Sequence, residues 1–263
     1  MNILDRIITH KRKEVEERML QFPVKALEKS AWFSTPAVSL KKALLDETNP
    51  GIIAEFKRKS PSKGVIHKDA DAVQITSGYE QAGASALSIL TDTEFFGGTN
   101  DDLVSSRKAS RIPILRKDFI VDEYQIVEAK SIGADVILLL ASVLSANEIK
   151  QFATTAKFLG MEVLLEIREM PDLRSVNILV DCVGVNNRNL KDFNVNVQQS
   201  YELAGHIPKD FIKISESGID SAKTLHGLRE AGFMGFLIGE TFMKEKDPVA
   251  ACSKLIREVK EYK

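Results

Sequence analysis

Eight short apolar runs recur along the chain, and each is followed by a segment of helical character. Most runs are apolar at both odd and even positions, as expected of parallel strands that helices cover on both faces. Eight such βα units with right-handed crossovers favour a closed parallel (β/α)8 TIM barrel, an α/β fold. The runs are Gly51–Phe56, Ala86–Leu90, Ile112–Arg116, Val136–Leu140, Glu162–Ile167, Cys182–Asn186, Phe211–Ser215 and Gly235–Gly239.

Glycine repeats in phase with these runs, just before four of the strands. A glycine there can adopt the left-handed conformation that ends a helix, after which the chain turns into the next strand. An open doubly wound sheet is the alternative arrangement, but no G-x-G-x-x-G follows the first strand. The four glycines are Gly83, Gly133, Gly160 and Gly232.

Helix starts can also be read from the sequence. Ser145 with Glu148 forms a predicted capping box. Asp220 is a predicted N-cap, and Asp247 is another that a proline follows at the first helical position.

The first 50 residues do not follow the βα pattern. Ile3–Met19 predicts an amphipathic, highly charged helix, and Val38–Leu45 a second and shorter one, joined by a loop that contains Trp32. No linker separates this part from the rest. We therefore expect residues 1–263 to form a single domain, with 1–50 as an N-terminal helical extension and 51–263 as the barrel.

Composition excludes several classes of protein. With 36 Lys+Arg against 37 Asp+Glu, the formal charge is −1, so no nucleic-acid partner is expected. The longest near-apolar run, 136–144, is far below the roughly 20 residues of a membrane span, and the charged N-terminus lacks a signal-peptide core. Two cysteines cannot build a disulfide framework or a cysteine-rich zinc site. We expect a cytoplasmic protein, a monomer or weak homodimer.

Charged residues stand where the predicted strands end, which is where active sites of this fold lie. Residues two apart on a strand share a face, so six polar side chains can converge on one cavity. Lysine can donate a proton, glutamate can accept one, and arginine can hold a phosphate or carboxylate. The six are Glu55, Lys57, Lys117, Glu166, Asn186 and Arg188.

Two turns after the last two strands complete the pattern. Ser217-Gly218 and Gly239-Glu240 occupy the usual phosphate cradle of this fold, where backbone N–H groups face the anion. A phosphorylated small molecule with a second anionic or carbonyl end is the expected ligand.

At these residues the sequence resembles the indole-3-glycerol phosphate synthase family of tryptophan biosynthesis. The similarity spans nearly the whole chain in the right order, and "EFKRKSPSKG" and "LRKDFI" are its most specific blocks. The matching stretches are "IIAEFKRKSPSKG" (52–64), "ALSILTDTEFFGG" (86–98), "IPILRKDFIVDEYQI" (112–126), "GADVILLL" (133–140), "EVLLEI" (162–167), "GVNNRNL" (184–190), "ISESGI" (214–219) and "FLIGETFM" (236–243).

The resemblance implies an activity: conversion of 1-(2-carboxyphenylamino)-1-deoxyribulose 5-phosphate to indole-3-glycerol phosphate, with release of CO2 and water. It implies a lyase that needs no metal and no organic cofactor. By the same resemblance, Lys117 is the general acid and Glu166 the general base. Lys57 pairs with the substrate carboxylate, while Glu55 and Glu216 set the charge of the two lysines.

The remaining roles are carried over in the same way. Asn186 orients the sugar hydroxyls or Glu166, and phosphate is bound by Arg188, Gly218, Gly239 and the backbone N–H of Glu240. A carboxylate beside phosphate is unfavourable, and no conflict arises if the Glu240 side chain points away.

Five further residues complete the implied site. Ser60 and Ser217 help to position the substrate, and Phe96, Phe119 and Leu138 line the pocket for its aromatic ring. The basic segment 57–63 is expected to form a lid.

Two other functions fit the same pattern of residues. One is a different phosphosugar barrel enzyme: an isomerase, or a lyase that uses Lys117 as a Schiff-base nucleophile. The other is a non-catalytic phosphosugar-binding protein, which would need only the phosphate cradle.

Overall fold

Eight parallel strands close into a barrel in the computed structural model, which describes residues 2–190 and 192–262. The order around the barrel is β1-β10-β9-β8-β7-β6-β5-β4, so the predicted TIM barrel is confirmed and the open sheet is wrong. The strands are β1 (Ile52–Phe56), β4 (Ala86–Leu90), β5 (Ile114–Lys117), β6 (Val136–Leu140), β7 (Glu162–Ile167), β8 (Cys182–Asn186), β9 (Ile212–Glu216) and β10 (Gly235–Ile238).

Some strand boundaries differ from the expected ones by one or two residues. β5 begins at Ile114 instead of Ile112, because Pro113 has no N–H to donate to a neighbouring strand. β5 and β9 each extend one residue further than expected, to Lys117 and Glu216. Both extra residues are site candidates, so the barrel wall itself holds their backbones.

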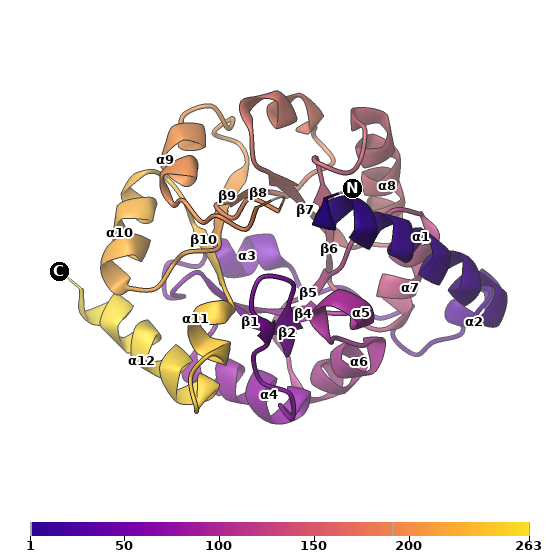
Figure 1. Ribbon diagram of the computed structural model, residues 1–263, viewed down its shortest axis with the longest axis horizontal. Coiled ribbons are helices and arrows are strands. Elements are labelled where there is room, and N and C mark those ends of the chain that lie inside the picture. Colours follow the sequence, from indigo (N-terminus) through magenta and orange to yellow (C-terminus); the bar gives the residue numbers. More distant parts are fainter. Residues whose placement is uncertain (1, 191, 263) are drawn as a thin grey trace.

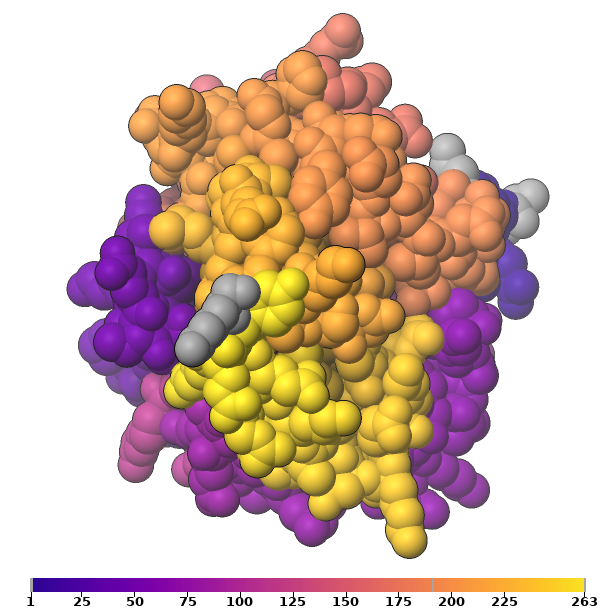
Figure 2. Space-filling model, turned by 90° about the vertical axis from the view of Figure 1, so that its left-hand side faces the viewer, coloured from indigo at the N-terminus to yellow at the C-terminus, as the bar shows by residue number. Residues whose placement is uncertain are grey.

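Helices surround the barrel (Figure 1). The C-terminal helix α12 packs against both α10 and α4, which closes the ring of helices where the last βα unit meets the first, and Figure 2 shows it in yellow between them. The outer helices are α4 (Ala72–Ala82), α6 (Asn100–Ala109), α7 (Tyr124–Ser131), α8 (Ala146–Phe158), α9 (Gln198–Ala204), α10 (Ala222–Glu230) and α12 (Pro248–Glu261); shorter ones are α5 (Thr93–Phe96), α11 (Glu240–Met243) and a 3₁₀ helix (Met170–Ser175).

The core has two layers. Ile53, Leu115 and Leu164 belong to the cluster inside the barrel, while their strand neighbours pack outward against the helices. These three residues were expected to share a face with the charged strand ends. The polar residues that follow them on the same face are therefore aimed at the barrel mouth.

The helix ends follow the predicted local rules with one exception. All four joint glycines have positive φ, between 74° and 97°, and the Ser145–Glu148 capping box and the Asp247 cap are present. The predicted Asp220 cap is wrong, because Ser221 caps α10 by accepting a hydrogen bond from the backbone N–H of Thr224.

The N-terminal extension reaches both ends of the barrel. It contains α1 (Ile3–Gln21), α2 (Val24–Leu27) and α3 (Leu40–Leu45), and α2 lies where only a loop was expected. α3 begins two residues later than predicted, because Ser39 caps it. Leu40 and Leu44 are buried with the barrel interior, so α3 closes the end opposite the strand termini that carry charge.

A small hairpin lies in the segment that was expected to form a lid. β2 (Lys59–Ser60) pairs antiparallel with β3 (Gly64–Val65). Within the described ranges, no helix is long and apolar enough to cross a membrane.

The closure of the barrel by α3 yields a stability prediction. Leu44→Ala should lower the free energy of unfolding by about 2–5 kcal/mol, because it removes a buried side chain and leaves a cavity. The exposed neighbour Leu45 is the matched control, and Leu45→Ala should change that free energy by less than about 0.5 kcal/mol. Urea unfolding measures both. Equal effects of the two substitutions would contradict the closure role of α3.

Candidate active site

A cavity of about 950 Å³, including its open mouth, lies at the carboxyl ends of the strands. All fifteen residues that the sequence nominated line it: Glu55, Lys57, Ser60, Phe96, Lys117, Phe119, Leu138, Glu166, Asn186, Arg188, Glu216, Ser217, Gly218, Gly239 and Glu240.

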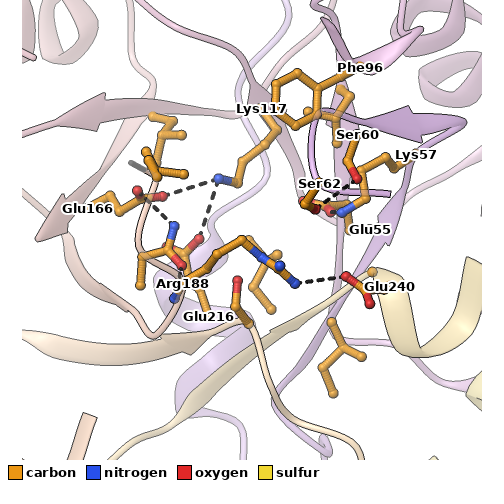
Figure 3. A pocket seen from close by; sticks show the side chains of 18 of the residues that line it. Glu55, Lys57, Ser60, Ser62, Phe96, Lys117, Glu166, Arg188, Glu216 and Glu240 are labelled. Atoms are coloured by element: carbon orange, nitrogen blue, oxygen red, sulfur yellow. Dashed lines mark hydrogen bonds and ion pairs between the residues drawn. The ribbon is translucent and has the colours of Figure 1, made fainter. Parts of the chain in front are cut away.

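Lys117 is held at the centre of the cavity by carboxylates (Figure 3). Its Nζ lies 3.2 Å from Glu166 Oε2 and 3.5 Å from Glu216 Oε2. Burial disfavours the ammonium, but the charges of Glu166, Glu216 and Glu55 outweigh burial and raise the pKa of Lys117. Lys117 therefore enters any reaction as a protonated acid.

Glu166 is oriented from its other side. Asn186 Nδ2 donates a hydrogen bond of 3.0 Å to Glu166 Oε1, which leaves Oε2 toward Lys117. Asn186 Oδ1 in turn accepts the backbone N–H of Arg188 at 2.9 Å. A single amide thus fixes both a candidate base and the start of the candidate anion site.

Lys57 and Glu55 form a second ion pair, with 2.7 Å between Lys57 Nζ and Glu55 Oε1. Burial opposes the ionisation of Glu55, but the charges of Lys57 and Lys117 lower its pKa below the usual value. Gly239 makes room for this pair, since a Cβ on Gly239 would lie 2.4 Å from Glu55 Oε1. A side chain at that position would push the carboxylate away from its lysine.

Glu216 differs from the other two glutamates. Its burial, and the nearby charges of Glu166 and Glu55, raise its pKa to about 8 against the pull of Lys117. Within the described residues, Glu216 Oε1 has no hydrogen-bond partner, and Gly184 leaves it the space that a Cβ would fill. The carboxyl group of Glu216 therefore ionises less readily than that of Glu55, whose pKa is lowered.

The candidate phosphate cradle lies on the β8–β10 side. Ser217 and Gly218 both have left-handed backbones, with φ of 69° and 76°; such conformations gather at functional sites. Arg188 Nη2 lies 2.7 Å from Glu240 Oε2, and Lys63 Nζ approaches the other oxygen of Glu240 at 3.5 Å. The Glu240 side chain therefore does not point away from the cradle, because the guanidinium of Arg188 attracts it.

An apolar wall faces this cradle across the cavity. The rings of Phe96 and Phe119 lie 5.8 Å apart, tilted by 38°, and Leu138 lies near them on β6. The sequence reasoning did not nominate Leu140, which shares a strand face with Leu138 and could have been found by that spacing. It also did not nominate Ser62, whose hydroxyl lies 3.2 Å from that of Ser60.

Across residues 2–190 and 192–262, no group of three or more His, Cys, Asp and Glu side chains is arranged to hold a metal ion. The residues that line the cavity include no histidine or cysteine.

Comparison with known proteins gives one consistent result. Residues 4–255 match the family model described as indole-3-glycerol phosphate synthase. The indole-3-glycerol phosphate synthase of Bacteroides thetaiotaomicron is 47% identical over 247 residues, covering 94% of this chain and 95% of that protein. That of Thermoanaerobacter pseudethanolicus is 42% identical over 261 residues, covering 98% of both, and that of Campylobacter jejuni is 40% identical over 259 residues, covering 97% and 100%.

The raised pKa of Glu216 predicts how stability changes with pH. An unfolded Glu216 loses its proton near 4.5 and the folded one near 8, so stability falls as pH rises between these values. Glu216→Gln removes this contribution, and its free energy of unfolding should fall less steeply between pH 5 and 8 than that of the wild type. Urea unfolding at several pH values measures the slope.

The control for this prediction is Glu202→Gln, at an exposed site on α9. It should keep the wild-type slope. An identical slope in Glu216→Gln and the wild type would mean that Glu216 is ionised in the folded protein.

Proposed function

The chain belongs to the indole-3-glycerol phosphate synthase family, and on that premise we propose how the residues of its cavity carry out the reaction. The enzyme is a carboxy-lyase of tryptophan biosynthesis. It converts 1-(2-carboxyphenylamino)-1-deoxyribulose 5-phosphate to indole-3-glycerol phosphate, with loss of CO2 and water.

Substrate binding uses one anchor for the phosphate and a separate one for the carboxylate. The phosphate binds to Arg188 and to the backbone N–H groups of Gly218, Gly239 and Glu240, on the β8–β10 side. The carboxylate of the aromatic ring pairs with Lys57, which directly follows β1. Because the substrate is held at both ends, it folds so that the ring carbon meets the ketone. This positioning lowers the entropic part of the barrier to ring closure.

Ring closure needs a proton on the ketone oxygen as the carbon–carbon bond forms. Lys117 supplies it, and the new hydroxyl group remains on the ring. The observation that supports this role most is the position of its ammonium between Glu166 and Glu216, which keeps it protonated and fixed where negative charge develops.

The later steps return the ring to aromaticity. CO2 leaves from the carbon that attacked, and the electrons of the broken bond restore the benzene ring. Glu166 then removes a proton while the hydroxyl group leaves as water with a proton from an acid. The apolar wall of Phe96, Phe119 and Leu138 favours the loss of CO2, because it solvates the carboxylate poorly.

The alternative functions gain no support from the comparisons. A Schiff-base lyase would need Lys117 as a neutral amine, and its raised pKa opposes that state. A non-catalytic binding protein would have no use for two partly buried lysines paired with three buried glutamates.

The extension and the barrel act together as one domain in this proposal. Support comes from contacts at the start of α3 and just before it. Lys41 N in α3 donates to Glu162 at 2.9 Å, and Val38 N, which precedes the cap of α3, donates to Asp135 at 2.7 Å; these acceptors stand at the starts of β7 and β6. Action in the cytoplasm, as a monomer or weak homodimer, stays a prediction from the sequence, as does movement of the hairpin as a lid.

The acid and base roles predict large losses of turnover. Lys117→Ala should lower kcat by roughly 10²–10⁴-fold, because the oxyanion loses its proton donor. Glu166→Gln should lower kcat to a similar extent with KM largely kept, since Gln is isosteric. The fluorescence of the indole product measures turnover, and near-normal kcat in Lys117→Ala would contradict the acid role.

The Arg188–Glu240 pair predicts opposite effects on binding. Arg188→Ala should raise KM about tenfold or more, because phosphate loses a charge-assisted partner. Glu240→Gln should lower KM, because its carboxylate competes with phosphate for the same guanidinium. Steady-state kinetics test both, and an unchanged KM in Arg188→Ala would remove Arg188 from the phosphate site.

A further inference from the structure

We propose that Lys11, on α1 and outside the cavity, is a positioning residue for ring closure. Its buried ammonium holds together the carboxyl ends of β4 and β5, which place the general acid Lys117 and the two rings of the apolar wall, Phe96 and Phe119. This inference rests on the function proposed above. Lys11 does not line the cavity, so it acts through other residues.

Lys11 is the feature of α1 that packing alone does not explain. It is 1% exposed and lies on the buried stripe of Leu4, Ile7 and Val15, where an apolar residue is expected. Its Nζ lies 3.0 Å from both Asp92 Oδ2 and Asp118 Oδ1, and 2.9 Å from Glu14 Oε2. Asp92 and Asp118 are themselves buried.

Asp92 orients one ring of the apolar wall. It caps α5, where its Oδ1 accepts the backbone N–H groups of Phe95 at 2.7 Å and Phe96 at 3.2 Å. The ammonium of Lys11 lies beside its other oxygen, Oδ2. Loss of that cation would leave a buried carboxylate uncompensated, at a large penalty.

Asp118 orients the other ring and the acid itself. It directly follows Lys117, and its Oδ1 accepts the backbone N–H of Phe119 at 2.8 Å. Its Oδ2 accepts a hydrogen bond of 2.6 Å from the hydroxyl of Thr91. The backbone N–H of Thr91 in turn donates to the carbonyl oxygen of Lys117 at 3.2 Å. Burial opposes ionisation of Asp118, but Lys11 and Arg116 lower its pKa to about 2.

These contacts make Lys11 the link between two adjacent strand ends. Without it, the carboxylates of Asp92 and Asp118 would repel each other in a site that excludes water. The peptide segments they hold would separate, carrying Phe96 away from Phe119 and shifting the backbone of Lys117. A displacement of about 1 Å in a positioning group can lower the rate by about 10²-fold.

The experiment compares Lys11→Met with Lys13→Met, an exposed site on the same helix. We expect Lys11→Met to lower kcat by about 10- to 100-fold and to change KM by less than about threefold. The phosphate cradle lies on β8–β10, away from Lys11, so anchoring of the substrate should survive. Lys13→Met should retain wild-type kcat and KM.

A second variant separates positioning from simple loss of fold. The double variant Lys11→Met/Asp92→Asn removes the uncompensated carboxylate and keeps an N-cap on α5. Where Lys11→Met lowers kcat about 100-fold, the double variant should have a kcat at least about tenfold higher than that of Lys11→Met. Circular dichroism sets a temperature at which every variant is folded. Should Lys11→Met fail to fold, Lys11→Gln, which keeps one donor, takes its place.

The outcomes are distinct. Wild-type kcat in a folded Lys11 variant, or a KM that rises as much as kcat falls, would overturn the positioning role. Absence of indole product from the wild type and from Lys13→Met would instead overturn the proposed function.

Discussion

The arrangement of this active site depends on keeping the ammonium of Lys117 charged at a buried position. Burial alone would favour the neutral amine, so the barrel mouth gathers Glu166, Glu216 and Glu55 around Lys117. Burial and the charges of Glu166 and Glu55 raise the pKa of Glu216 to about 8, because three carboxylates so close cannot all ionise easily. Gly184 and Gly239 supply the space that these carboxylates occupy.

A second cation, the buried ammonium of Lys11, helps to position Lys117 from outside the cavity. Lys11 comes from the extension and compensates Asp92 and Asp118, whose backbone contacts place Phe96 and Phe119. The extension therefore has contacts at both ends of the barrel: α1 reaches the strand ends that form the cavity, and α3 fills the opposite end. The proposed mechanism thus draws on residues that lie outside the eight βα units.

Much of the fold and site could be predicted from residue types and spacing. The eight apolar runs and the four joint glycines led to the barrel, because a strand end and a helix end are each decided by a few neighbouring residues. Boundaries were less accurate: the Asp220 cap is wrong by one residue, and α2 was not expected. Such details depend on which of two adjacent caps, or which short turn, packs best in the folded chain.

The sequence by itself determined that six polar residues at the strand ends face the cavity, since a period of two on parallel strands and the place where each strand ends are local properties. Tertiary structure alone decided which charged residues pair. Lys117 lies between Glu166 and Glu216, and Glu240 forms an ion pair with Arg188. Lys11 forms ion pairs with both Asp92 and Asp118. The physical reason is distance. Coulomb interaction and desolvation act between atoms that the closed barrel brings within a few ångströms, however far apart they lie along the chain.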